Sequence, residues 1–272
     1  LKLQPDSFET VDGLLELARK SRREDEILEF LSLKLTLETD PQQQALLHLE
    51  LSAFWNARAD PQRAHEHLEA AHRLTPTARI VTEPFVKSLI AKEMWRQAHA
   101  LLVPLLEAER GDSVGDDAEL WELVAQCAEA LDDVPGALEA CRQAVRVGGE
   151  QLDRVETLAD LLMRAEEWTE AANRYDQLIQ HPDASWTASQ RVELALRSSK
   201  AATAGGERER AASSLVTLGD DTTLTSADLQ RIAEALAQMT CWTEAVATRR
   251  RLVTITQDAE ERSEQLAHIA MI

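Results

Sequence analysis

The segment WTEAANRYDQLI, residues 168–179, decides the fold, because its opening string Trp-x-x-Ala recurs twice in the chain. The other two copies begin at Trp95 and Trp242, and an apolar pattern with helical spacing follows each of them. Weaker copies lie between these three. Counted at the alanine, the seven anchor positions are Ile27, Ala64, Ala98, Ala137, Ala171, Ala211 and Ala245. Their intervals alternate between a shorter and a longer value, which indicates a repeat protein with a larger unit of two repeats.

Each repeat is predicted to be a pair of antiparallel helices. Apolar or small residues occur 16, 13, 12 and 9 positions before an anchor, and in the fourth repeat they are Trp121, Val124, Ala125 and Ala128. Further apolar residues occur 4 and 7 positions after an anchor, as at Tyr175 and Leu178. Both spacings place the residues on one face of a helix. A small anchor lets the two helices approach closely, while larger residues fill the space around it.

These repeats resemble the tetratricopeptide repeat family. The resemblance rests on Trp121 in a first helix, on Trp168, Ala171 and Tyr175 in a second helix, and on Pro182 just after it. Seven copies in register carry it over essentially the whole chain. It implies an all-α fold, a right-handed superhelical solenoid of antiparallel helix pairs, whose first helices line a concave surface.

Some repeats depart from the family pattern. Ile27 replaces the small anchor of the first repeat, and Arg249 occupies a position that is usually aromatic. Glycine is missing from most helix–helix turns, and Gly206 is the clear exception. We interpret these copies as degenerate repeats.

A single tetratricopeptide-like solenoid is predicted for residues 1–272. Its seven repeats are expected at 8–41, 45–78, 79–112, 118–151, 152–185, 192–225 and 226–259, followed by a truncated helix at 260–272. The first and last segments both read as parts of further repeats, so the chain is expected to be a fragment of a longer one.

The composition supports a helical protein and excludes several functions. Ala and Leu together number 80, whereas Gly and Pro number 17, which disfavours sheet folds. A net charge of -19 argues against binding nucleic acid or an anionic membrane surface. The longest apolar run, residues 101–106, is far too short to span a bilayer. Three cysteines fit reduced thiols, which slightly favours a cytoplasmic location.

A second stripe of each first helix is expected to face the concave surface. Counting back 18, 15, 11 and 8 from each anchor gives its positions, and this spacing again marks one helical face. It is apolar or mixed in the second and third repeats and mostly acidic in the fourth and fifth. The candidate partner-binding residues are Leu46, Leu49, Asn56, Ile80, Glu83, Lys87, Ile90, Glu119, Glu122, Gln126, Glu129, Asp153, Glu156, Asp160 and Met163.

Two interpretations of this stripe stay open. An acidic protein exposes carboxylates everywhere, so the acids could simply be solvated surface. Alternatively, they form an acidic middle portion of a groove that suits a basic partner, next to an apolar pocket. Lysine occurs on the stripe only at Lys87 and Lys200, so recognition of carboxylate-ended peptides, which the family resemblance would otherwise suggest, is not expected.

The predicted function is a protein–protein interaction scaffold that binds a protein or peptide segment in the groove. The alternatives are a regulatory arm that gates a catalytic domain outside the fragment, and a sensor of peptides or small molecules. No grouping of catalytic type rises above chance, so the chain is not expected to be an enzyme or to need a cofactor. The oligomeric state stays open.

No metal site is expected. His65 and His67 are two residues apart on a helix and point away from each other, and the four histidines His48, His65, His67 and His72 read as ordinary helix residues. The acidic loop at 111–117 lacks the alternating ligand spacing of a calcium site. Cys127 and Cys141 are predicted to be small core residues.

Overall fold

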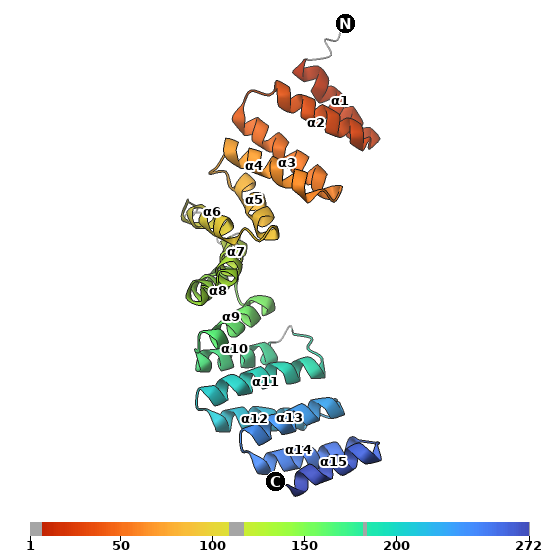
Figure 1. Cartoon of the computed structure of the whole chain (residues 1–272), viewed down its shortest axis with the longest axis vertical. Helices are drawn as coiled ribbons and strands as arrows, with labels where there is room; N and C mark the ends of the chain where they lie inside the picture. The colour runs from red at the N-terminus through yellow and green to blue at the C-terminus, as the bar shows by residue number, and fades with distance from the viewer. Residues whose placement is uncertain (1–6, 109–116, 182–183, 272) are drawn as a thin grey trace. The chain divides into compact units, whose positions relative to one another are not determined.

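The computed structural model describes residues 7–108, 117–181 and 184–271, and this part of the chain contains helices and no strands. The chain divides into two compact units, residues 1–113 and 114–272, and each is described by itself. Unit 1 contains α1 (Phe8–Ser21), α2 (Glu24–Leu37), α3 (Pro41–Ala57), α4 (Pro61–Leu74), α5 (Arg79–Ala91) and α6 (Trp95–Ala108) (Figure 1). Unit 2 contains α7 (Asp117–Ala130), α8 (Val134–Gly148), α9 (Leu152–Arg164), α10 (Trp168–Gln180), α11 (Ala188–Ala204), α12 (Arg208–Gly219), α13 (Ser226–Gln238), α14 (Trp242–Ile255) and α15 (Ala259–Ala270).

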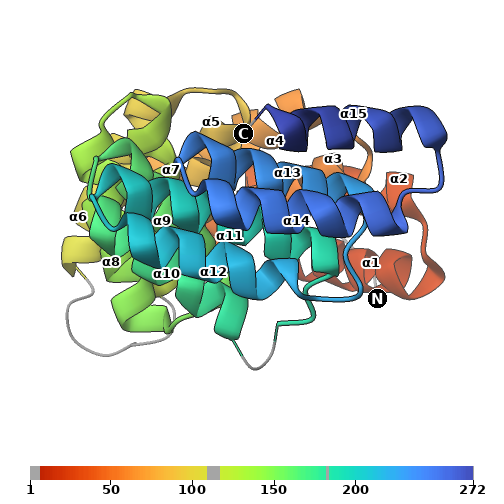
Figure 2. The ribbon, with the colours of Figure 1, turned by 90° about the horizontal axis from the view of Figure 1, so that it is seen from below.

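Within each unit, every helix packs against the next helix along the chain. In unit 2, α13, α14 and α15 pack in succession, and Figure 2 shows them running in nearly the same direction across the view. The all-α fold predicted from the sequence is confirmed. Continuity of the array between the two units depends on residues 109–116, which lie outside the described residues, so a single solenoid with the predicted repeat boundaries stays a prediction.

Capping residues explain where several helices begin. Asp40 and Asp60 each accept a hydrogen bond from a first-turn amide, and a proline follows each of them at the first helical position. Thr187 and Thr225 form complete capping boxes at the starts of α11 and α13. These local signals set the lengths of the helices independently of the packing stripe.

The turn inside each helix pair contains one residue in the left-handed conformation. Gly206 has a φ of 85° there, but the other six turns place a non-glycine residue at φ between 53° and 62°. These residues are Arg22, Ala59, Glu93, Asp132, Glu166 and Thr240. A non-glycine residue at this position therefore keeps the turn geometry but strains the turn by about 1 kcal/mol.

The anchors are buried in the helix packing, except at Ile27. All six alanine anchors are 0–2% exposed, and Tyr175, which lies one turn after Ala171, is 1% exposed. Ile27 is only partly buried and packs against the cluster of Leu15, Leu31 and Leu51. Arg249, which takes an aromatic position, is 7% exposed and donates a hydrogen bond to Gln265 Oε1 at 2.7 Å. A buried polar pair there replaces an aromatic contact.

Candidate protein-binding surface

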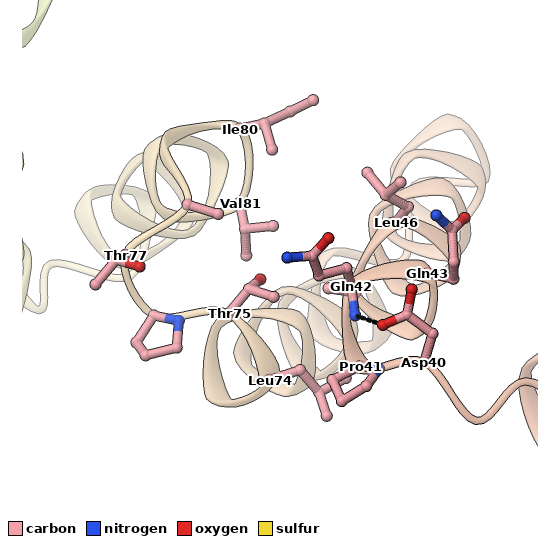
Figure 3. A pocket seen from close by; sticks show the side chains of 13 residues that line it. Asp40, Pro41, Gln42, Gln43, Leu46, Leu74, Thr75, Thr77, Ile80 and Val81 are labelled. Carbon is pink, nitrogen blue, oxygen red and sulfur yellow. Dashed lines mark hydrogen bonds between the residues drawn. The ribbon is translucent and has the colours of Figure 1, made fainter.

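In unit 1 the stripe residues lie on α3 and α5, and the two at the first turns of these helices are exposed. Leu46 is 43% exposed and Ile80 is 64% exposed. Both line a pocket of about 680 Å³ that is formed by the first turns of α3 and α5 and by the turn between α4 and α5. Figure 3 shows their side chains on the rim of this pocket.

The floor of the pocket is apolar because it belongs to a small core cluster. Ala45 and Val81 are buried in this cluster, and Leu74 and Ala78 pack against it. Since several of these side chains are small, they leave the space between the two helix starts unfilled. The polar lining residues are Asp40, Gln42, Gln43, Thr75 and Thr77. The Asp40 carboxylate accepts a hydrogen bond from the backbone N–H of Gln42 at 3.1 Å (Figure 3).

A second pocket of about 530 Å³ lies beside the first and shares Gln43 and Leu46 with it. Its other lining residues come from α1, α2 and α3 and from the residue after α2, and they are Phe8, Arg19, Lys34, Glu38, Leu47 and Glu50. Arg19 forms an ion pair with Glu50, and Lys34 lies 5.0 Å from the centre of the Phe8 ring. Leu46 therefore separates two adjoining hollows on the surface of unit 1.

The remaining stripe residues of unit 1 are either packed or paired, except for Asn56. Leu49 packs against the pocket-floor cluster, and Ile90 is half-buried. Glu83 accepts a hydrogen bond from Lys87 at 2.7 Å and forms a longer contact of 3.5 Å with Arg79. Burial alone would raise the pKa of Glu83, but these two cations lower it overall. Asn56 is exposed near the end of α3.

In unit 2 most of the predicted acidic stripe is paired with arginines of the next first helix. Glu122 and Glu129 on α7 form ion pairs with Arg154 and Arg164 on α9. The Arg154 side chain is only 10% exposed and also donates a hydrogen bond to the carbonyl of Gly148 at 2.7 Å. These contacts connect neighbouring helix pairs and cover part of the negative charge.

The same arrangement continues from α9 to α11 and α13. Arg197 on α11 lies 3.2 Å from Glu156 and 3.3 Å from Asp160, so it holds both carboxylates of α9. Asp160 also accepts a hydrogen bond from the Tyr175 hydroxyl at 2.5 Å. Burial and the Asp160 carboxylate raise the pKa of Tyr175. Glu193 on α11 in turn pairs with Arg231 on α13.

Two carboxylates of the stripe stay available. Glu119 and Asp153 are exposed, and neither forms an ion pair within the part of the chain that the structure describes. Each holds the earliest stripe position of its repeat, as do Leu46 and Ile80 in unit 1, and we call these four positions the first row. On the same stripe, Gln126 is exposed and Met163 is half-buried. The first row, together with Asn56 and Gln126, is thus the part of the stripe that is free to contact a partner.

Sequence reasoning missed the arginines that pair with the stripe. Arg154, Arg164, Arg197 and Arg231 lie 32 to 41 residues after their carboxylate partners, which is about one repeat length. An arginine one repeat downstream of a stripe acid is therefore the signal that could have identified the paired positions.

The histidines and cysteines singled out in the sequence lie in helix contacts: Cys127, Cys141 and His65 are buried, and His48, His67 and His72 are half-buried. The Nδ1 atoms of His48 and His67 lie 2.9 Å apart, so these two rings contact each other although His65 and His67 diverge. Within the described residues, no group of three or more His, Cys, Asp or Glu side chains gathers as a metal site. Burial raises the pKa of Cys127 and of Cys141 to about 11. The acidic loop considered for calcium lies almost wholly outside the described residues.

No described helix has the length and apolar content that crossing a bilayer requires. No protein-family model matches the sequence, and no curated protein matches it either.

Solved structures with a similar fold do exist. A tetratricopeptide repeat protein from Parabacteroides merdae is 12% identical, with a TM-score of 0.54 over 97% of this chain and 99% of that one. YrrB, described as a TPR protein with an unusual peptide-binding site, is 15% identical, with a TM-score of 0.52 over 65% of this chain and 85% of that one. MamA from Desulfovibrio magneticus is 15% identical, with a TM-score of 0.52 over 65% and 97%. The chain therefore has the tetratricopeptide repeat fold.

Proposed function

We propose that the chain is a non-enzymatic protein-interaction module that binds a segment of a partner protein on the first helices of its repeats. The observation that carries the proposal is the pocket of about 680 Å³ in unit 1, with Leu46 and Ile80 exposed at its edge. Exposed apolar side chains beside an apolar hollow favour a binding role over a purely solvated surface.

The partner segment is expected to be extended and to insert an apolar side chain into the pocket. Burying one large aliphatic side chain contributes roughly 1.5–3 kcal/mol, so a single anchor supports only modest affinity. Gln42, Gln43, Thr75 and Thr77 offer amide and hydroxyl groups that can bond to a peptide backbone. YrrB, which shares the fold, is described as having a peptide-binding site, and this likeness supports the same use of the fold here.

A basic portion of the partner would bind unit 2, as a second and weaker element of the proposal. Glu119 and Asp153 are exposed and unpaired among the described residues, and the whole chain carries a charge of -19. Exposed carboxylates attract basic segments, and salt screens this attraction. The other four stripe acids are engaged by arginines, so a basic partner would have to compete for them.

The first experiment selects peptides from a random library on the wild-type chain and measures their binding to Leu46→Asp/Ile80→Asp. Binding is expected to fall at least about tenfold, because a carboxylate at each position makes the pocket edge polar. Leu17→Asp is the matched control, since Leu17 is 61% exposed on α1 and does not line the pocket. Equal loss in the control, or no loss in the double variant, would refute the pocket as the site.

The acidic element is tested by two charge variants. One changes all six acids, with Glu119, Glu122, Glu129 and Glu156 becoming Gln and Asp153 and Asp160 becoming Asn; the other changes only Glu119 and Asp153. Most of the loss of basic-peptide binding is expected in the smaller variant already, because it removes the unpaired carboxylates. If binding is unchanged in both variants, the stripe acids are solvated surface.

A further inference from the structure

Four histidines lie in the packing between α3, α4 and α5 of unit 1. His48 is on α3, and His65, His67 and His72 are on α4. His65 is buried, and the other three are half-buried. The proposed partner-binding surface uses none of them.

His48 and His67 form a hydrogen-bonded pair that joins α3 to α4. Their Nδ1 atoms are 2.9 Å apart, and the ring centres are 5.2 Å apart. At this distance one Nδ1 must donate its proton and the other must accept it. If both rings were protonated, both Nδ1 atoms would carry a proton, so two N–H groups and two positive charges would face each other. The hydrogen-bonded pair therefore tolerates at most one added proton.

The other two histidines join α4 to α5 through one aromatic ring. His65 and His72 lie 5.6 Å and 5.1 Å from the centre of the Phe85 ring. The Nδ1 of His65 is 2.8 Å from the Ser88 hydroxyl, and the Nδ1 of His72 is 3.3 Å from the Thr82 hydroxyl. That Thr82 hydroxyl donates to the Pro76 carbonyl at 3.1 Å, which connects His72 to the lining of the pocket.

The surroundings of these rings disfavour their charged forms. Burial lowers the pKa of all four histidines, and His67 further lowers that of His48. Few charged groups face these rings. Lys92 also lowers the pKa of His65, whereas Glu66 and Glu69 raise it, and Glu66 raises the pKa of His67 as well. The two glutamates offset only part of the effect of burial.

We propose that these four histidines make the packing of α3, α4 and α5, and with it the shape of the pocket, sensitive to mild acid. Protonation of both His48 and His67 breaks their contact, and a charge on His65 or His72 is partly desolvated in the packing of α4 against α5. α4 then separates from α3 and α5, and the pocket that their ends form is lost. This response to acid is a property of the chain by itself, so it does not depend on whether a partner binds the pocket.

The sign of the effect follows from linkage. In the opened state the histidines regain an ordinary pKa near 6.5, whereas in the packed state the pKa is lower. The opened state therefore binds protons first as the pH falls. Stability is complete above about pH 6.5 and decreases below it, in a range where most carboxylates keep their charge.

Hydrogen exchange measured by mass spectrometry at about pH 7.5 and pH 5.5, corrected for the intrinsic rate, tests this. Amides of α3–α5 are expected to exchange at least about tenfold faster at the lower pH, since one pK unit of linkage is a factor of ten. Peptides from α7–α9, which contain no histidine, are the internal comparison. Equal exchange in α3–α5 at both pH values would overturn the proposal.

A non-titrating variant assigns the effect to these residues. His48→Gln, His65→Gln, His67→Gln and His72→Gln combined should remove the acid response, whereas His268→Gln, at an exposed position on α15, should keep it. An acid response that persists in the fourfold variant contradicts the proposal. If that variant does not fold, the imidazole proton resonances of the wild type decide: at least His48 or His67 must titrate below the ordinary value near 6.5, and titration of all four at or above that value overturns the proposal.

Discussion

The first row of the stripe carries Leu46 and Ile80 in unit 1 and Glu119 and Asp153 in unit 2. All four side chains are exposed, so the same position is open in both units but differs in chemistry. The second row, about one helical turn further along each of these helices, includes Glu83, Glu122 and Glu156, each of which is held by a cation. The comparison teaches that on α3, α5, α7 and α9 the stripe contains two kinds of position, with the first row open to partners and the second engaged in structure.

The largest expected effect on stability comes from the buried alanine anchors, which both units contain. Ala98→Leu in unit 1 and Ala171→Leu in unit 2 should each lower the free energy of unfolding by about 1–3 kcal/mol, because each alanine is fully buried between two helices. Urea denaturation measures this, with Ala227→Leu, at an exposed position on α13, as the control. A large loss in only one unit would show that the anchors are not equivalent.

The fold could be predicted because the anchor pattern is local and repeats seven times. Ala171 and Tyr175 are sufficient to place one helix pair, and the other copies follow in register. The candidate site was predictable only in part. A carboxylate such as Glu156 looks the same in sequence whether it faces water or holds Arg197, and its partner lies 41 residues away on another helix. Packing across repeats, which the stripe alone does not encode, decides between the two.

A smaller effect on stability is expected when the cations that hold the second-row carboxylates are removed, and it should differ between the two units. Arg197→Met removes the cation that holds Glu156, Asp160 and Glu193, and it should destabilise by about 1 kcal/mol, since the network is half-exposed and partly screened. Lys87→Met, which leaves Glu83 its longer contact with Arg79, should cost less than about 0.5 kcal/mol. Denaturation at low and at high salt checks both, and the difference between the variants should shrink at high salt. Equal losses would show that the network has no added strength.

Replacing strained turn residues should have a comparable effect of opposite sign. Thr240 has a φ of 62°, and the equivalent turn position of another repeat is occupied by Gly206. Thr240→Gly is expected to raise the free energy of unfolding by about 0.5–1 kcal/mol. Glycine adopts the left-handed conformation without the steric cost that threonine has there, and this gain exceeds the additional entropy that glycine loses on folding. Glu93→Gly in unit 1 should stabilise by a smaller amount, since glutamate is not β-branched. A destabilised Thr240→Gly protein in thermal melting would contradict the account of these turns.

The smallest effect on stability is expected in the first row. Ile80→Gln and Glu119→Gln should each change the free energy of unfolding by less than about 0.5 kcal/mol, as is usual for exposed side chains without specific partners. Chemical denaturation of both variants, next to Glu122→Gln, measures the contrast between rows. If Glu119→Gln costs as much as Glu122→Gln, the first row is not free.

The most direct test of the free first row is the affinity of one selected peptide for two matched variants over a range of salt. Fluorescence polarisation with the labelled peptide would give the Kd for Leu46→Asp/Ile80→Asp and for Glu119→Gln/Asp153→Asn, next to the wild type. Binding should weaken at least about tenfold at every salt concentration in the first variant, because apolar contacts are not screened. In the second variant any loss should appear only at low salt, where exposed carboxylates act. Unchanged affinity in both variants, with the peptide still bound, would contradict the claim that the first row is the binding surface.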